Sequence, residues 1–179
     1  MEMEKNMKAI ILSFVLCLGI GFSGTTMAAE SPFYLGLKAG KMMVDPAEFE
    51  DATSMGLVFV GYRFSNNPGG SLAIEGEYTN SSSENITVLG VTGKWDIDTI
   101  AVYVAYRSGG DLYFKGKAGY LHEDINVSIV GASISGSDSG LSVGIGGGWK
   151  IGKSNAFELE YTIVEEDVSF LSLGFNFGF

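Results

Sequence analysis

The chain has 179 residues, which is enough for one domain, and a formal net charge of −10 at pH 7. Charged residues make up 18% of it, below the roughly one quarter that is typical of soluble domains. A nucleic-acid-binding face needs a basic patch, so the acidic balance argues against a nucleic-acid partner.

The N-terminus predicts a secretory signal peptide over residues 1–29. Lys8 precedes an apolar run over residues 9–20, which is too short to span a bilayer about 30 Å thick. Small residues follow the run, as a signal-peptidase site requires, and we expect cleavage after Ala28 or Ala29.

The mature domain is expected to cover residues 30–179 and to contain no thiol. Cys17 is the only cysteine and lies in the signal, which excludes disulfides from the mature chain. Acidic residues close to Met1 are unusual in a signal, so Met7 is an alternative start. Beyond the signal no apolar run reaches the length of a membrane helix, so a membrane location would need strands.

Eight segments of about ten residues show the period-two alternation of strands. In chain order they are residues 33–42, 55–64, 72–79, 97–107, 112–121, 141–151, 156–164 and 168–179. Short turns and longer loops alternate between them, with the short turns at residues 65–70, 108–111 and 152–155. Alternating apolar residues within 86–91 and within the loop 123–140 favour hairpins that extend beyond the membrane.

The closing segment indicates which face of the strands meets lipid. Phe175, Phe177 and Phe179 alternate with small or polar residues, and an aromatic is the terminal residue. Such an aromatic fits the boundary between membrane and water, where the last strand pairs with the first to close a barrel. Phe170 is the exception to the alternation, and an edge strand of a soluble sandwich is the alternative.

Strand number and length fit a membrane barrel. Three short turns and four longer loops match an outer-membrane barrel, with the turns in the periplasm and the loops outside. Ten residues at about 3.3 Å each, tilted by about 40°, climb roughly 25 Å, which matches the apolar band. The sequence therefore predicts an all-β fold, an eight-stranded antiparallel up-and-down transmembrane β-barrel. A soluble barrel with its apolar face inward is the alternative.

Charged residues gather on the opposite face of the strands, which lines the lumen in a membrane barrel. Buried opposite charges are tolerable there if they pair. We expect glutamates to pair with bases in a lumen network of Arg63, Glu75, Glu77, Arg107, Lys115, Lys117, Glu158 and Glu160. Lys38 and Lys150 share this face, and glycines at 144, 146 and 148 fit a crowded interior. The network predicts a plug; the alternative is a narrow porin-like channel for small ions or solutes.

A family resemblance covers essentially the whole mature chain and is clearest in residues 33–40, 61–64, 73–78 and 168–179. In these stretches the chain resembles the small outer-membrane β-barrel family, with its OmpA-like transmembrane domain and opacity-protein and OmpX-like relatives. The resemblance implies the cell outer membrane of a Gram-negative bacterium. It also implies that Phe175, Phe177 and Phe179 form the C-terminal signal that the barrel-assembly machinery recognises.

No catalytic or metal-binding set is evident, and no cofactor is expected. His122 is the only histidine, and with no mature cysteine the usual transition-metal clusters are excluded. Some outer-membrane barrels modify lipid A with a histidine, a serine and a carboxylate. Ser128 and Ser133 are near His122 in sequence, but nothing places them within hydrogen-bond reach. We expect a non-enzymatic protein with a structural or surface-interaction role, and a lipid A-modifying enzyme is the second alternative.

The expected outer loops hold most of the acidic excess, including Glu84, Asp96, Glu123, Asp138 and Glu165. A solvated rim in contact with outer-membrane lipid and lipopolysaccharide is the simplest interpretation. Divalent-cation bridging to lipopolysaccharide phosphates, or a basic extracellular partner, is left open.

Overall fold

The alternating segments form long antiparallel strands in the structure, a computed structural model that describes residues 32–45, 52–88, 90–129 and 131–179. The strands are β1 (Phe33–Val44), β2 (Ala52–Asn67), β3 (Gly70–Ser81), β4 (Glu84–Val88), β5 (Val91–Ser108), β6 (Leu112–Ile129), β7 (Ala132–Ile151), β8 (Asn155–Glu165) and β9 (Val168–Gly178). The predicted signal peptide lies outside the described residues. None of the described residues forms a helix long and apolar enough to cross a membrane.

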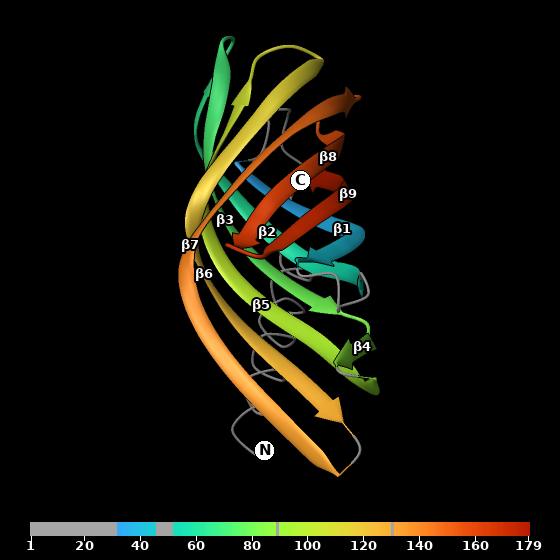
Figure 1. Cartoon of the computed structure of the whole chain (residues 1–179). Coiled ribbons are helices and arrows are strands. Elements are labelled where there is room, and N and C mark those ends of the chain that lie inside the picture. Colours follow the sequence, from blue (N-terminus) through green and yellow to red (C-terminus); the bar gives the residue numbers. More distant parts are fainter. Residues whose placement is uncertain (1–31, 46–51, 89, 130) are drawn as a thin grey trace.

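Eight of these strands close into a ring, as the sequence predicts. Each pairs with the next in the order β3-β2-β1-β9-β8-β7-β6-β5, and β5 pairs with β3 to complete the circle (Figure 1). The first and last strands meet in antiparallel register, with Leu35 opposite Phe177. Closure gives every strand of the ring a partner on both sides within the barrel, which hydrocarbon requires.

The outward face of the ring is apolar. Large hydrophobic side chains are exposed along it, including Val102, Leu159 and Leu173, each more than half exposed. Polar and charged residues at alternate positions are buried instead, among them Glu75 and Lys115. This pattern is the reverse of a soluble barrel and confirms the predicted orientation of the two faces.

The segment over residues 123–140 is a pair of strands. β6 and β7 stay paired in unbroken register from Leu112 opposite Trp149 to Ile129 opposite Ala132. Gly131, at φ 84°, adopts the left-handed conformation beside this last pair. The two strands extend past the others at the lower end in Figure 1. β4 pairs with β5 and forms a second, shorter extension. It lies in the region of residues 86–91, where the sequence predicts a hairpin that extends beyond the membrane.

An apolar cluster fills the lumen at the end with the long hairpins. It contains Met42, Trp95, Ile97, Leu121 and Phe170, all of them at most 3% exposed. Phe170 therefore breaks the alternation of the last strand because its inward position meets this cluster rather than the polar part of the lumen. The interior thus has an apolar layer that the sequence analysis missed.

Candidate functional site

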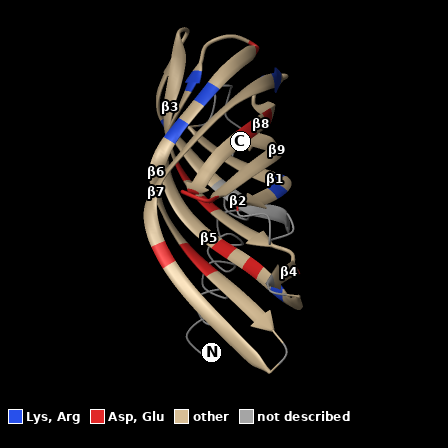
Figure 2. Ribbon diagram, in the orientation of Figure 1, with Lys and Arg blue, Asp and Glu red and all other residues tan. Residues whose placement is uncertain are grey.

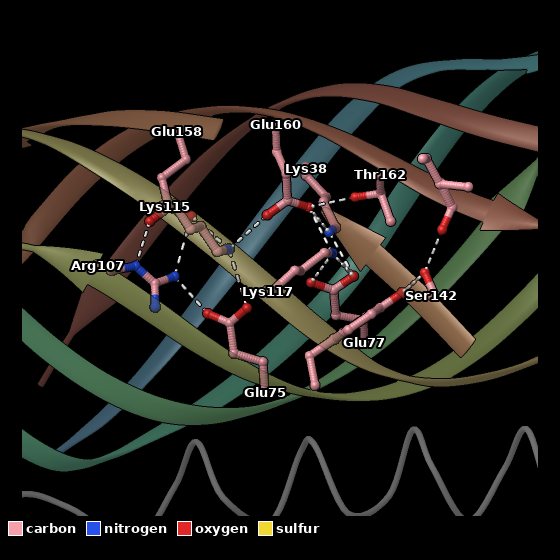
Figure 3. A network of polar contacts seen from close by, with 12 residues as sticks. Lys38, Glu75, Glu77, Arg107, Lys115, Lys117, Ser142, Glu158, Glu160 and Thr162 are labelled. Carbon is pink, nitrogen blue, oxygen red and sulfur yellow. Dashed lines mark hydrogen bonds and ion pairs between the residues drawn. The ribbon is translucent and has the colours of Figure 1, made fainter. Parts of the chain in front are cut away.

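The buried charges of the lumen form one connected network (Figure 3). The structure brings together seven of the eight predicted residues, and Lys38 of β1 joins them. Four bases and four acids take part: Lys38, Arg107, Lys115, Lys117, Glu75, Glu77, Glu158 and Glu160. The formal charges of this set cancel, which a buried cluster needs in order to avoid uncompensated charge.

Arg107 anchors the half of the network nearest the short turns. Its Nε donates to Glu158 Oε1 at 2.6 Å, and its Nη2 donates to Glu75 Oε1 at 2.5 Å. Tyr113 and Lys115 also donate to Glu158, at 2.6 and 3.0 Å. Tyr34, fully buried on β1, donates to Glu75 at 2.5 Å and accepts from Arg107 at 2.9 Å.

Lys115 links the two halves of the network. Its Nζ lies 3.1 Å from Glu75, 3.0 Å from Glu158 and 2.7 Å from Glu160. Glu160 in turn contacts Lys117 at 2.7 Å and Lys38 at 3.1 Å. One ammonium group therefore holds three carboxylates that come from two strands on different sides of the ring.

The glycines of β7 give the β6 side chains room to reach β8. Cross-strand pairing aligns Lys115 with Gly146 and Gly146 with Glu160, so the glycine lies between the two charged residues. A Cβ atom on Gly144 would come within 2.8 Å of Lys117 Cε, and one on Gly148 would overlap the Tyr113 ring. The interior is crowded at these glycines, as predicted, because long side chains of β6 cross over β7.

Arg63 lies at the short-turn end of the lumen. Its guanidinium lies over the Tyr34 ring, 4.6 Å from the centroid, and its side chain lines the opening at the short-turn end. Lys38, which the sequence places on the same face without naming a partner, joins the network with its Nζ 2.7 Å from Glu77. The expected pairing of Arg63 with the glutamates of the lumen stays a prediction.

A separate cluster of carboxyl groups lies where β6 rises above the apolar belt. Tyr120 is the last outward aromatic of β6, and exposed His122 follows it on the same face. Glu123 is 1% exposed, and its Oε2 atom has no hydrogen-bond partner among the described residues. Burial raises the pKa of the Glu123 carboxyl to about 8, and so do a hydrogen bond with Glu165 and the nearby acidic charges.

His122 contacts a different serine from the two considered from sequence. Its Nδ1 lies 2.7 Å from Ser139 Oγ, directly across the hairpin, and its Nε2 lies 3.8 Å from Asp124 Oδ1. Ser128 and Ser133 instead contact each other at 3.3 Å. Within the described part of the chain, no group of three or more His, Cys, Asp or Glu residues is placed to hold a metal ion.

The C-terminal aromatics form a small stack on the outside of the ring. Phe175 packs between Phe157 and Phe177, with ring centroids 4.7 and 4.5 Å apart. Phe177 and Phe179 are 40% and 63% exposed, so they lie open to the surroundings of the barrel. Trp149, close to the same end, is 60% exposed.

Removing the linking ammonium should destabilise the barrel strongly. We expect Lys115→Met to lower the free energy of unfolding by about 3–5 kcal/mol, because it leaves buried carboxylates uncompensated. Urea unfolding in lipid vesicles measures this. Lys94→Met, at an exposed lysine of β5, is the control and should change it by less than about 0.5 kcal/mol. Adding Glu160→Gln to Lys115→Met should recover part of the loss; equal effects at Lys115 and Lys94 would contradict the network's role.

Stability should also depend on pH through Glu123. Its folded-state pKa lies above the ordinary 4.5, so the folded barrel holds this proton more tightly than the unfolded chain. The stabilisation of the folded barrel by this proton is fully present below pH 4.5 and is lost as the pH rises through about 8. We expect thermal unfolding temperatures to fall over this window and Glu123→Gln to reduce the fall. An unchanged pH profile in the variant would contradict the assignment.

Comparison with known proteins places this geometry in a family. The chain matches the outer membrane protein beta-barrel domain family over residues 14–179. No curated protein matches the chain.

Solved structures share the fold at low sequence identity. Neisserial surface protein A has a TM-score of 0.65 at 15% identity, over 85% of this chain and 100% of that one. Ail, the attachment invasion locus protein of Yersinia pestis, has a TM-score of 0.55 at 16% identity, over 85% and 98%. OprG of Pseudomonas aeruginosa has a TM-score of 0.54 at 10% identity, over 84% and 98%.

The closed ring of antiparallel strands agrees with the β-barrel domain that the matching family's description names. The family match spans most of the sequence and includes all the residues that the structure describes. The chain therefore belongs to the outer membrane protein beta-barrel domain family and is an outer-membrane β-barrel protein of the Gram-negative cell envelope.

Proposed function

We propose that this protein is a closed, non-enzymatic barrel with a structural and surface-interaction role. The observation that carries the proposal is the charge-balanced network across the lumen, in which Lys115 alone contacts three carboxylates. A conducting pathway would need mobile or widely spaced charges, whereas these side chains are buried and held by several partners each. An interior of eight strands is just wide enough for side chains.

A second barrier supports closure. The apolar cluster around Trp95, Ile97 and Phe170 occupies the lumen nearer the long hairpins. Ions or polar solutes that passed the charged layer would still meet a layer of buried apolar side chains, and the transfer of a charge from water into such a layer is strongly unfavourable. Two chemically different layers in series favour a plug over a narrow channel.

The surface role rests on the wall formed by β6 and β7. β7 pairs with β8 only from Val143 onward, so residues 132–142 have no partner strand on that side among the described residues. Residues 132–139 of this edge are all exposed, and the edge is rich in serine and glycine. An exposed edge can accept an added strand from another protein through backbone hydrogen bonds. Ail, which shares the fold, is named for attachment and invasion.

The arrangement around His122 gives little support to an enzyme. The distance of 3.8 Å from its Nε2 to Asp124 is longer than a hydrogen bond, and both side chains are about half exposed. A serine nucleophile needs a base whose developing charge is stabilised away from water. The contact with Ser139 is better explained as a cross-strand pair that stabilises the hairpin.

Assembly and surroundings follow from the outer surface. We infer that the barrel-assembly machinery recognises β9 through Phe175, Phe177 and Phe179, since the latter two are exposed on the outside. Outer-membrane lipid contacts the apolar belt, and lipopolysaccharide lies near the acidic hairpins. A basic extracellular partner would complement the same acidic residues.

Conductance in planar lipid bilayers tests closure directly. We expect the refolded wild-type protein to give no stepwise currents, because both layers of the lumen are filled. Heat-modifiable migration on a detergent gel verifies folding of the same sample. Reproducible unitary currents from folded wild-type protein would favour the narrow channel instead.

A further inference from the structure

The end of the barrel with the short turns contains a cavity whose polar lining is basic or neutral. It has a volume of about 50 Å³. This is several times the roughly 10–15 Å³ that one water molecule requires, so an ion of a few non-hydrogen atoms fits. All three short turns contribute to the lining, and the cavity therefore opens on the periplasmic side.

Four basic side chains line the cavity: Arg63, Arg107, Lys150 and Lys153. The other polar side chains lining it are asparagine, serine and tyrosine, and no carboxylate is among the described residues that form the wall. Asp111, the acidic residue of the short turn 108–111, is not among the lining residues. The whole chain has 21 acidic and 11 basic residues, so this concentration of bases runs against its overall composition.

The charge balance of the lumen leaves this cavity positive. The buried network cancels its own charge with four bases and four acids, and Arg107 is the only one of those eight residues that lines the cavity. Lys150 and Lys153 belong to no described ion pair and are exposed on the cavity's rim. In Figure 2 the bases of β6 and β7 lie towards the short turns and the acids towards the long hairpin.

Two groups at the floor of the cavity can bind a ligand. Asn176 is 3% exposed, and its Oδ1 atom has no hydrogen-bond partner among the described residues. The oxygen and nitrogen of this amide can be assigned either way round, and with the NH₂ group in the place of Oδ1 the side chain would donate rather than accept. Arg107 makes four hydrogen bonds to Tyr34, Glu75 and Glu158, which leaves one of its five N–H donors for a ligand.

We propose that this cavity is a binding site for a phosphate-type anion at the periplasmic mouth of the barrel. Arg107 and Asn176 form the floor, and the ammonium groups of Lys150 and Lys153 close over the anion from the rim. Their flexible side chains suit a tetrahedral oxyanion, because each contributes a point charge with three donors. The site lies at the opposite end from the surface hairpins and does not depend on the proposed surface role.

Titration of inorganic phosphate by NMR tests this site. The isotope-labelled protein is held in nanodiscs of neutral lipid, and sodium chloride of equal ionic strength serves as the reference salt. We expect saturable shifts of the Asn67, Ser108 and Ser154 amides with phosphate only. The double variant Lys150→Gln/Lys153→Gln should weaken binding by about tenfold or more, as expected for losing charge-assisted hydrogen bonds. Lys94→Gln, an exposed lysine at the other end of the barrel, is the matched control and should leave binding unchanged.

A second set of titrations distinguishes the two possible sources of the phosphate group, an anionic lipid headgroup and a free anion. If an anionic lipid headgroup occupies the site, nanodiscs containing phosphatidylglycerol should shift the same amides without added phosphate and reduce the effect of free phosphate. If the ligand is a free anion, the lipid should have no effect and the titration should persist. Shifts that are equal with chloride, or that survive unchanged in the folded double variant, would overturn the proposal.

Discussion

Pairing of opposite charges inside the lumen is the constraint on which the rest of this barrel depends. Strands that expose Leu, Val and Phe to lipid must turn their alternate residues inward, and here many of those residues are charged. The inward charges are acceptable because four bases and four acids cancel within hydrogen-bonding distance. The glycines of β7 follow from the same constraint, since Lys115 and Tyr113 must cross that strand to reach β8. The outward apolar face and the inward network are therefore two consequences of one alternation.

The interior changes character along the axis of the barrel. The periplasmic mouth is basic, the middle is a neutral network, the next layer is apolar, and the rim near the long hairpins is acidic. Each layer uses the same inward positions of the strands, so the order of side chains along a strand sets the order of layers. Along β6, for example, the inward residues include Lys115 and Lys117 in the network, Leu121 in the apolar layer and Glu123 at the acidic rim. The two ends of the lumen therefore differ in charge, with a neutral network and an apolar layer between them.

Much of the fold could be predicted from sequence because the side-chain period of a strand is strict. Alternation over the eight segments indicated the ring, the inward face and the membership of Glu75, Glu158 and Lys115 in the lumen. The pairing of glutamates with bases followed from their shared face, whereas the individual pairs depend on the stagger between strands, which is why the contact of Lys38 with Glu77 was not foreseen. Phe170 is visible in the sequence as an exception to the alternation of the last strand. Its inward position indicates an apolar layer in the lumen, which the sequence analysis did not predict. The contact between His122 and Ser139 depends on the register of a hairpin whose turn the sequence did not locate.

Quenching of the two tryptophans tests the central assignment of faces most directly. Trp149 points outward and is 60% exposed, whereas Trp95 lies in the lumen and is 1% exposed. Single-tryptophan variants, Trp95→Phe and Trp149→Phe, can be folded into vesicles that contain brominated phospholipid. The account predicts strong quenching of Trp149 by the brominated lipid and protection of Trp95 from both that lipid and aqueous iodide. Lipid quenching of Trp95 together with iodide quenching of Trp149 would contradict it.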